Sequence, residues 1–298
     1  MLQIGDIEVH ILNDVTYFVD AGGPFGLVPR ALYSRYMQPN ENNLVPQAQL
    51  TLFLRVGGKN IVVDTGYGSK VDRRMQRILH FQQPFDGLMR GLTKLGVSPA
   101  DIDLVINTHL HGDHCTGNTI LTEEGELAAA FPNAEYVVQR REYEDASHPN
   151  ERTRATYIPF NYEPLLASGQ MRLLDGDSEL APGVHGIVTP GHTPGHMSVR
   201  LESQGQHAAF ICDLASYAVH FERLSWMTAY DVEPLITLET KRHWQQWAIQ
   251  TEATLIFVHD AKRPVGKLKA NEEGGNPFLE VIETPIFNMD PAVYNTAF

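Results

Sequence analysis

Three histidines and an aspartate crowd into six residues, 109–114, directly after a short apolar run. Neutral imidazole and carboxylate groups are the ligands that Zn²⁺ and similar divalent ions take in proteins. His109 and His111, two residues apart, can reach one ion from the end of a strand, whereas Asp113 and His114 in the following turn point to a second ion. So many titratable groups in one turn would be costly to bury without a cation to pair them. This short segment therefore predicts a site for two divalent metals.

Further ligands have to come from distant parts of the chain, and suitable side chains stand where other apolar runs end. His192 lies in a turn rich in proline and glycine, Asp213 follows an apolar run, and His259 ends another. In open sheets, ligands gather beyond the strand ends, where polar side chains converge without burying unpaired charge. We therefore expect these three residues to complete the metal site.

Ten short runs, apolar throughout or alternating with polar residues, are separated by turn residues and predict strands. These runs are residues 4–12, 49–56, 60–63, 104–107, 134–138, 170–174, 183–188, 197–201, 208–211 and 254–258. Apolar residues at helical spacing predict helices over 85–95 and 238–251. Gly57 and Gly58, between the second and third runs, predict a tight hairpin with antiparallel strands.

Strands dominate this pattern and helices are spaced through both halves of the chain, which is typical of the mixed α/β (α+β) class. No low-complexity linker, tandem repeat or break in composition divides the sequence. We therefore expect residues 1–298 to form a single domain. Two polar, proline-containing stretches, near 20–46 and 141–164, are expected to be loop excursions that cover or bind a ligand.

The chain is acidic, with 36 Asp and Glu against 23 Lys and Arg and a formal net charge of −13. Such a field repels nucleic acid and anionic membranes. The N-terminus lacks the basic and apolar pattern of a signal peptide, and no run approaches the roughly 18 apolar residues of a membrane span. We therefore expect a cytoplasmic protein that binds neither nucleic acid nor membrane.

The two cysteines, Cys115 and Cys212, are too few for a disulfide framework, which fits a reducing compartment. Each adjoins a candidate ligand, and thiolates bind zinc well. Cys212, if it lies on a strand, points to the face opposite its neighbour Asp213. We therefore expect both cysteines to be small buried packing residues.

The candidate ligands, taken in order along the chain, resemble the full ligand set of the metallo-β-lactamase superfamily. The resemblance implies two divalent ions, zinc in the first place, with iron, cobalt or manganese as alternatives. It assigns one ion to His109, His111 and His192, the other to Asp113, His114 and His259, and the bridging position to Asp213. It also implies an αββα sandwich of two mixed β-sheets flanked by helices, with the metals at one edge.

Two further residues are expected to support the ligands. Asp64 matches the Asp-x-Gly that this superfamily carries at a strand end, and its plain alternative is a turn residue before Gly66. We expect Asp64 to accept the ring N–H of a ligating histidine and so fix the tautomer of that ring. His196 is expected to be a supporting or structural residue, because the ligand set is already full.

Outside the metal motif, the stretches 20–30, 229–231 and 258–261 resemble the longer quorum-quenching N-acyl homoserine lactonases. The resemblance implies a hydrolase that opens a lactone ring, N-acyl homoserine lactone above all, by attack of a metal-bridging hydroxide. Asp113 or Asp213 would shuttle the proton. An aryl-ester or organophosphate triester hydrolase would use the same metals and is the alternative.

Shorter lactonases carry a tyrosine three positions after the bridging aspartate, where this chain has Ser216 followed by Tyr217. Tyr217, or else His220, which matches the longer lactonases and related organophosphate hydrolases, is expected to assist catalysis.

Phe25, Leu27 and Val28, close together in the 20–46 stretch, are expected to line a channel for an apolar acyl arm. The alternative is that they are plain core or dimer contacts. The expected partners are a small lactone or ester substrate and a second copy of the chain in a homodimer.

Overall fold

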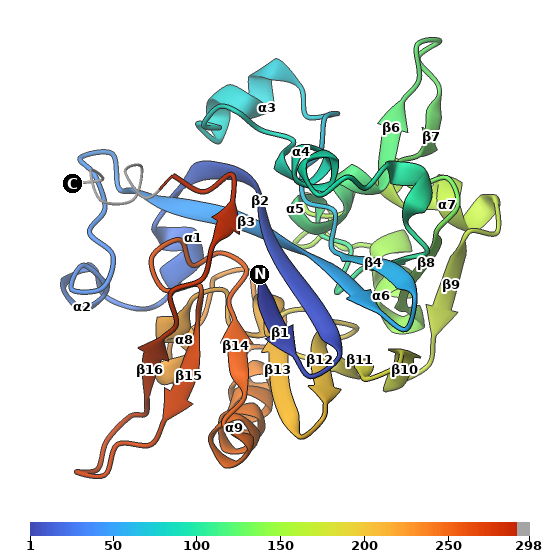
Figure 1. The fold of residues 1–298 in the computed structure, drawn as a ribbon. Coiled ribbons are helices and arrows are strands. Elements are labelled where there is room, and N and C mark those ends of the chain that lie inside the picture. The colour runs from blue at the N-terminus through green and yellow to red at the C-terminus, as the bar shows by residue number, and fades with distance from the viewer. Residues whose placement is uncertain (291–298) are drawn as a thin grey trace.

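The computed structural model describes residues 1–290, which fold into two mixed β-sheets packed face to face (Figure 1). The first sheet has the order β1 (Leu2–Ile4), β2 (Ile7–Asp20), β3 (Leu44–Val56), β4 (Lys59–Val63), β5 (Leu104–Ile106), β8 (Glu135–Gln139) and β9 (Met171–Leu174), with β17 (Ile286–Phe287) beside β2. Strands β1 to β4 pair antiparallel, and β4, β5, β8 and β9 pair parallel.

The second sheet has the order β10 (Ser178–Ala181), β11 (Val184–Val188), β12 (Met197–Ser203), β13 (Gln206–Phe210), β14 (Thr254–Ile256), β15 (Val265–Lys269) and β16 (Phe278–Val281). Its pairs are antiparallel except for β13 and β14. A separate hairpin joins β6 (Thr119–Leu121) to β7 (Leu127–Ala129). Each of the ten predicted runs overlaps a strand, whereas β6, β7, β10 and β15 to β17 were not predicted.

The sheets meet through one apolar layer because side chains alternate along each strand. In β3, Leu52 and Leu54 belong to the fully buried core between the sheets, together with Val199 and Phe210 of the second sheet. Phe53 points the other way, into the cluster beneath the outer helices. The predicted hairpin between β3 and β4 is also confirmed, since the two glycines of its turn have positive φ angles of 57° and 75°.

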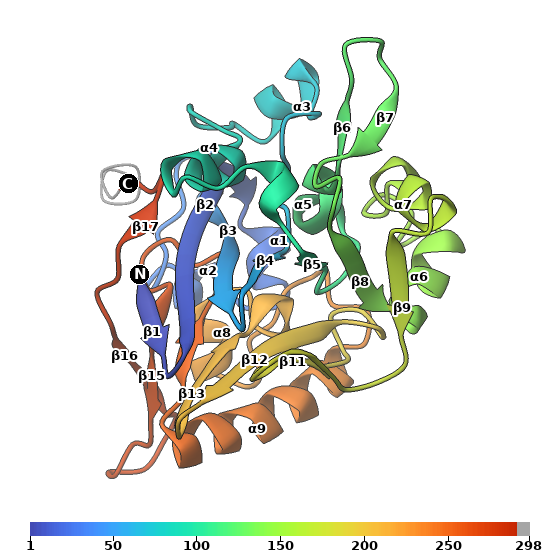
Figure 2. The ribbon, with the colours of Figure 1, turned by 45° about the vertical axis from the view of Figure 1, so that its right-hand side comes forward.

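Helices cover the outer face of each sheet, which gives the expected αββα sandwich (Figure 2). The first sheet is covered by α4 (Gly87–Lys94), α6 (Arg140–Ser147) and α7 (Glu163–Ala167), and the second by α8 (Ala218–Glu222) and α9 (Pro234–Thr251). Shorter helices are α1 (Gly22–Phe25), α2 (Arg30–Tyr33), α3 (Arg73–Ile78) and α5 (Gly112–Cys115), and 3₁₀ turns span Pro99–Asp101, Thr116–Asn118, Pro159–Asn161 and Cys212–Leu214.

The two predicted helices are confirmed as α4 and α9. The second begins earlier than predicted, at Pro234, because proline suits the first turn of a helix. Within residues 1–290, none of the helices combines the length and the apolar character needed to cross a bilayer.

The two stretches that were expected to be loop excursions contain more regular secondary structure than predicted. The ends of the 20–46 stretch belong to the paired strands β2 and β3, and α1 and α2 lie between them. Most of the first half of the 141–164 stretch is helix α6, and α7 begins at Glu163. The prediction of a loop was wrong for α6 because its mostly charged sequence carries few apolar residues, although glutamate and arginine are good helix formers.

Candidate metal centre

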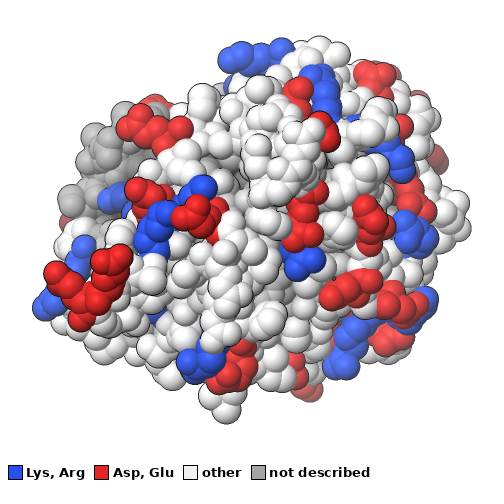
Figure 3. All heavy atoms as spheres, turned by 60° about the horizontal axis from the view of Figure 1, so that its bottom comes forward, with Lys and Arg blue, Asp and Glu red and all other residues white. Residues whose placement is uncertain are grey.

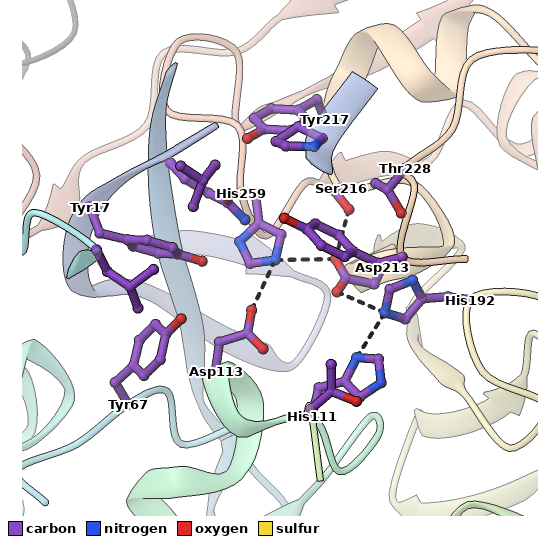
Figure 4. A pocket seen from close by; sticks show the side chains of 16 residues that line it. Tyr17, Tyr67, His111, Asp113, His192, Asp213, Ser216, Tyr217, Thr228 and His259 are labelled. Carbon is purple, nitrogen blue, oxygen red and sulfur yellow. Dashed lines mark hydrogen bonds and ion pairs between the residues drawn. The ribbon is translucent and has the colours of Figure 1, made fainter. Parts of the chain in front are cut away.

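Seven side chains converge at one edge of the sandwich, where β5, β11, β13 and β14 lead into loops. Figure 4 shows those that line the cavity above them, His111, Asp113, His192, Asp213 and His259. The loop after β5 and the short helix α5 supply four of the seven, and each of the other three strands is followed by one. In chain order the seven are His109, His111, Asp113, His114, His192, Asp213 and His259. All are buried except Asp113, whose side chain is 23% exposed. The structure thus brings together every ligand candidate that the sequence singled out.

The seven fall into two groups, within each of which the potential ligand atoms lie within 4.8 Å of one another. One group is His109, His111 and His192, and the other is Asp113, His114, Asp213 and His259. Asp213 lies between the groups. Its Oδ2 is 3.3 Å from Nε2 of His192 and 3.2 Å from Nε2 of His114, and its Oδ1 is 3.2 Å from Nε2 of His259.

Three of these histidines are oriented by an acceptor on the outer side of the ring. The Nδ1–H group donates over 2.9 Å in each case, from His192 to Asp231, from His114 to Asp64 and from His259 to the backbone carbonyl of Ala48. A carboxylate or carbonyl oxygen can only accept, so Nδ1 carries a proton and Nε2 faces inward, with its lone pair free to bind a metal when the ring is neutral.

The inward lone pairs face the carboxylate of Asp213, which repels them unless a positive charge lies between. In addition, Nε2 of His109 and Nε2 of His114 are buried without a hydrogen-bond partner among residues 1–290. Buried polar atoms are rarely left unpaired without a reason. Imidazole nitrogens and carboxylate oxygens grouped at this spacing suit a divalent metal, so the residues present fit the ions that the sequence predicts.

The electrostatics of the cluster point the same way. Burial and then the neighbouring histidines lower the pKa of His109, and burial lowers that of His111 to about 3, so both rings keep a free lone pair. Burial works against the charged form of His114, but Asp113 and Asp213 outweigh it and raise its pKa above the usual value. The cluster therefore attracts positive charge.

Asp64 makes the contacts expected of a supporting carboxylate. Besides His114, it accepts hydrogen bonds over 2.8 Å from both the backbone N–H and the hydroxyl of Thr108. Its backbone has a positive φ of 53° at the end of β4, where the strand turns into the loop. One carboxylate thus fixes the start of the histidine loop and the ring of a candidate ligand.

The expectation that Cys212 lies on a strand was wrong. Strand β13 ends at Phe210, and Cys212 begins a 3₁₀ turn with a positive φ of 51°, so strand alternation no longer applies. Its Sγ lies 3.1 Å from the hydroxyl of Thr108 and 3.6 Å from Oδ2 of Asp64. Both cysteines are free and buried, as expected, and burial raises the pKa of each thiol.

His196 uses both ring nitrogens in hydrogen bonds. Its Nε2 accepts the backbone N–H of Asp213 over 3.2 Å, so Nδ1 carries the proton toward Thr189. Because Nε2 is already occupied, His196 holds the Asp213 turn in place and is not free to serve as a ligand.

A cavity of about 160 Å³ opens over the cluster. Five of the candidate ligands line it, together with the aromatic rings of Tyr17, Tyr67 and Tyr217 (Figure 4). Tyr230 also lines the cavity. The hydroxyl of Tyr217 has no hydrogen-bond partner among residues 1–290. The hydroxyl itself is buried, so a small molecule in the cavity would meet the cluster and the rings of the wall.

Most of the chain, residues 44–245, matches the metallo-beta-lactamase superfamily. The chain belongs to the metallo-beta-lactamase superfamily. The resemblance that the ligand motif indicated is therefore confirmed, and so is the fold that it implied.

Curated relatives of this metallo-beta-lactamase chain are named N-acyl homoserine lactonases. One from Bacillus sp is 31% identical over 183 residues, which make up 61% of this chain and 65% of the relative. The lactonase AttM of Agrobacterium fabrum is 29% identical over 182 residues, 58% of this chain and 64% of the relative. The chain thus spans just under two thirds of the length of these relatives.

Two solved structures share the whole architecture of this metallo-beta-lactamase chain. A probable metal-dependent hydrolase from Staphylococcus aureus has a TM-score of 0.84 at 29% identity, over 95% of this chain and 100% of that chain. AidC, a dizinc quorum-quenching lactonase, has a TM-score of 0.75 at 20% identity, over 95% of this chain and 97% of that chain. At 20% identity, the second likeness shows the fold alone.

The three apolar residues expected to line an acyl channel are not among those that line the cavity. Phe25 is fully buried and stacks on Tyr33 at 4.4 Å, in a separate core cluster against which Val28 also packs. Leu27 is fully exposed. The expectation was wrong because α1 turns Phe25 inward, and Pro24 and Val19 take the place on the cavity wall.

Of the two residues expected to assist catalysis, only Tyr217 lines the cavity. His220 is buried behind it, with its ring edge-on to Tyr217 at 5.2 Å and to Phe25 at 5.6 Å. Neither ring nitrogen of His220 has a hydrogen-bond partner among residues 1–290, and burial lowers its pKa to about 3. A catalytic role for His220 is therefore not favoured by its position.

Sequence reasoning missed Asp231, the buried carboxylate that orients His192 and is itself held by the hydroxyl of Thr228 over 2.8 Å. It also missed Glu142, which is fully buried beside the histidine loops, and gave no role to Tyr17, Tyr67 and Tyr230 of the cavity wall. Asp231 lies 39 residues from the histidine it orients, and the resemblance of residues 229–231 to lactonase sequence gave no sign of this contact. Such contacts arise only from the tertiary fold.

Proposed function

We propose that the chain is a metal-dependent hydrolase that opens the lactone ring of N-acyl homoserine lactones, with two divalent ions, zinc in the first place. The names of the curated relatives support the substrate class. The observation that carries the proposal is the convergence of three inward-facing Nε2 atoms on the carboxylate of Asp213, at 3.2 to 3.3 Å.

The proposed ligand roles follow the two groups of side chains. His109, His111 and His192 would hold one ion, Asp113, His114 and His259 the other, and Asp213 lies where it can contact both. When bound, two such ions lower the pKa of a coordinated water and polarise an ester carbonyl.

Three residues of the chain would handle protons and orientation. Asp113 and Asp213 both line the cavity, so either carboxylate can accept a proton from the attacking water and return it to the leaving alkoxide. The surrounding histidines, against the effect of burial, hold the pKa of Asp213 well below its usual range, which keeps this carboxylate ionised. The hydroxyl of Tyr217 is buried beside the cavity without a hydrogen-bond partner among residues 1–290, and it would donate a hydrogen bond to a substrate oxygen once the side chain moves toward the cavity.

An apolar groove of about 700 Å³ continues from the cavity and supports a substrate with an apolar arm. The cavity and the groove share Tyr67, Leu79, Asp113 and Thr156. The groove runs between the segment that carries α3, the β6–β7 hairpin and the loop before α7. Its wall holds half-exposed apolar side chains, namely Met75, Leu121, Ile158 and Phe160. We place the acyl arm in this groove rather than against the 20–46 stretch.

The charge of the protein suits the product. Opening a lactone gives a carboxylate, and the net charge of −13 favours the departure of an anion. On the face shown in Figure 3, acidic and basic side chains are interspersed over a largely uncharged surface, with no continuous basic stripe among the described residues. The cytoplasmic location and the homodimer stay predictions.

The proposal is tested by assaying the purified protein, with its metals, on N-acyl homoserine lactones of short and long chain and on a phosphotriester with a phenol leaving group. We expect rapid ring opening of lactones and slower attack on the triester. Rapid triester hydrolysis without opening of any lactone would move the protein to the aryl-ester or organophosphate class.

A further inference from the structure

Glu142 is a buried carboxylate that touches three separate segments around the metal centre. It lies in the first turn of α6 and is 0% exposed. Its Oε1 accepts the backbone N–H of Leu110 over 3.0 Å and the hydroxyl of Tyr157 over 3.1 Å. Its Oε2 accepts the hydroxyl of Thr193 over 2.5 Å. One side chain thus links parts of the chain that are distant in sequence.

Two of these contacts reach the loops that carry candidate ligands. Leu110 stands between His109 and His111, and Thr193 directly follows His192. The histidines of the three-histidine group therefore all lie within one residue of a hydrogen-bond donor to Glu142. Since the carboxylate accepts from both loops at once, it fixes the distance between them.

The third contact and the packing of the backbone strengthen this link. Tyr157 pairs with His111 in an isolated β-bridge, and their ring centroids lie 5.1 Å apart. In the His192 loop, a Cβ at Gly195 would lie only 2.2 Å from the backbone nitrogen of Glu142, so this close approach requires glycine. The beginning of α6 is therefore pressed against the same loop that its carboxylate holds.

The other group of candidate ligands is held by different partners. His114 is oriented by Asp64, and His259 by the carbonyl of Ala48. The three hydrogen bonds of Glu142 go to Leu110, Tyr157 and Thr193, outside helix α5 that carries His114 and outside the His259 loop. A change at Glu142 should therefore act on one half of the centre.

We infer that Glu142 is a positioning residue that sets the geometry of the three-histidine site by clamping the 109–111 loop to the His192 loop. The inference rests on the proposed metal centre. Removing the carboxylate leaves the buried N–H of Leu110 without its partner, a change that is costly in a protein interior. It also frees the two loops to move apart. Loss of groups that orient metal ligands typically lowers metal affinity about 10–100-fold.

The test measures the retention of zinc rather than activity. Zinc-loaded protein is challenged with rising concentrations of a chelator, and the zinc still bound is measured at each step. We expect Glu142→Ala to release one of its ions at about 10–100-fold lower chelator concentration than the wild type and to retain the other normally. Glu144→Ala, on the same helix at an exposed position, is the matched control and should release zinc as the wild type does.

Two milder variants keep the test informative if Glu142→Ala folds poorly. Glu142→Gln has the same shape, and its amide can still accept from Leu110 and Tyr157 while donating to Thr193, so its zinc retention should stay close to that of the wild type. Thr193→Val removes one donor without loss of volume. It should lower the retention of the same ion by a smaller factor. A Glu142→Gln protein that loses zinc as readily as Glu142→Ala would contradict positioning through these hydrogen bonds.

Two backgrounds identify the ion that is affected. In His259→Ala, which weakens the other site, Glu142→Ala should still lower the retention of the remaining ion. In His192→Ala, which weakens the three-histidine site, the same change should have little further effect, because its target is already lost. Equal effects in the two backgrounds would overturn the assignment of Glu142 to one half.

The outcomes separate the inference from the proposed function. A wild-type protein that binds no zinc or other divalent ion would refute the metal centre itself. A wild-type protein that holds two ions, with Glu142→Ala unchanged in both, would overturn the role of Glu142 alone.

Discussion

The candidate ligands and the side chains of the neighbouring groove share a border at Asp113 but differ in burial. Six of the seven ligands are at most 6% exposed, whereas Ile158 and Phe160 in the groove are 40% and 65% exposed. Each oriented histidine has a fixed acceptor behind it. The apolar groove side chains are placed by packing on one side only. The metal centre is therefore rigid, and the groove is the part in which a residue can change without disturbing the centre.

This difference has a consequence for substrate choice. In the proposed function every substrate depends on the metals, so a change among the candidate ligands or their supports should affect short and long acyl chains alike. A change in the groove alters only the contact with the arm, so its effect should grow with chain length. The following predictions use chain length to distinguish the two regions.

The largest effect is expected for Asp213→Ala. Asp213 contacts histidines of both groups, so its loss removes the one carboxylate that holds the two ions together. Ring opening should fall by more than the roughly 10–100-fold that is typical for a supporting residue, and equally for short and long lactones. Steady-state rates with metal analysis measure this. If Asp64→Ala or His196→Ala were more damaging at equal metal content, the ranking of these residues would be wrong.

Phe25→Ala should destabilise the fold without changing the preference for chain length. The ring is fully buried among aromatic side chains, and truncating a buried phenylalanine typically costs about 3–5 kcal/mol of unfolding free energy. Denaturant titration gives this value, and KM for short and long lactones gives the preference. If the variant had normal stability and a higher KM for long-chain lactones alone, Phe25 would have to be a substrate-binding residue.

Asp231→Ala should weaken the binding of the ion that the three-histidine group is proposed to hold. The carboxylate fixes the tautomer of His192, and such partners are typically worth about 10–100-fold in metal affinity. Competition with a chelator measures the affinity, with Asp64→Ala as the counterpart on the other side of the centre. A loss of ring-opening activity that differed between short-chain and long-chain lactones would contradict a role in metal binding.

The smallest effect is expected for Phe160→Ala. This side chain is 65% exposed on the groove wall, so the loss of its contact should be worth about 1 kcal/mol, or about a fivefold rise in KM for long-chain lactones. Short-chain lactones should be unaffected. Leu27→Ala, at a fully exposed position outside the groove, is the matched control and should change neither value. An equal rise in KM for both chain lengths would show that the acyl arm does not bind in the groove.

The convergence of the candidate ligands could be predicted from the sequence because they stand at or just beyond the ends of apolar runs, where local pattern and site geometry coincide. Asp64 was found in the same way, through its turn at the end of β4. Asp231 and Glu142 could not be found, since they meet their partners across 39 and 32 residues and only in the tertiary fold.

The fold shows the same limit. Alternation predicted the long strands, but the separate hairpin β6–β7 has two short, mostly half-buried strands and carries no such pattern. Phe25 was misplaced because an apolar residue in a stretch rich in glycine and proline suits a core or a pocket equally well. Only its packing against Tyr33 and Tyr217 decides between them.

The most direct test of the two-metal centre is to measure metal content and lactone ring opening on the same preparations, depleted of metal to different extents. The account predicts full activity at about two divalent ions per chain and a fall in activity as either ion is removed. A preparation that opens lactones at the full rate with one ion, or with none, would contradict it.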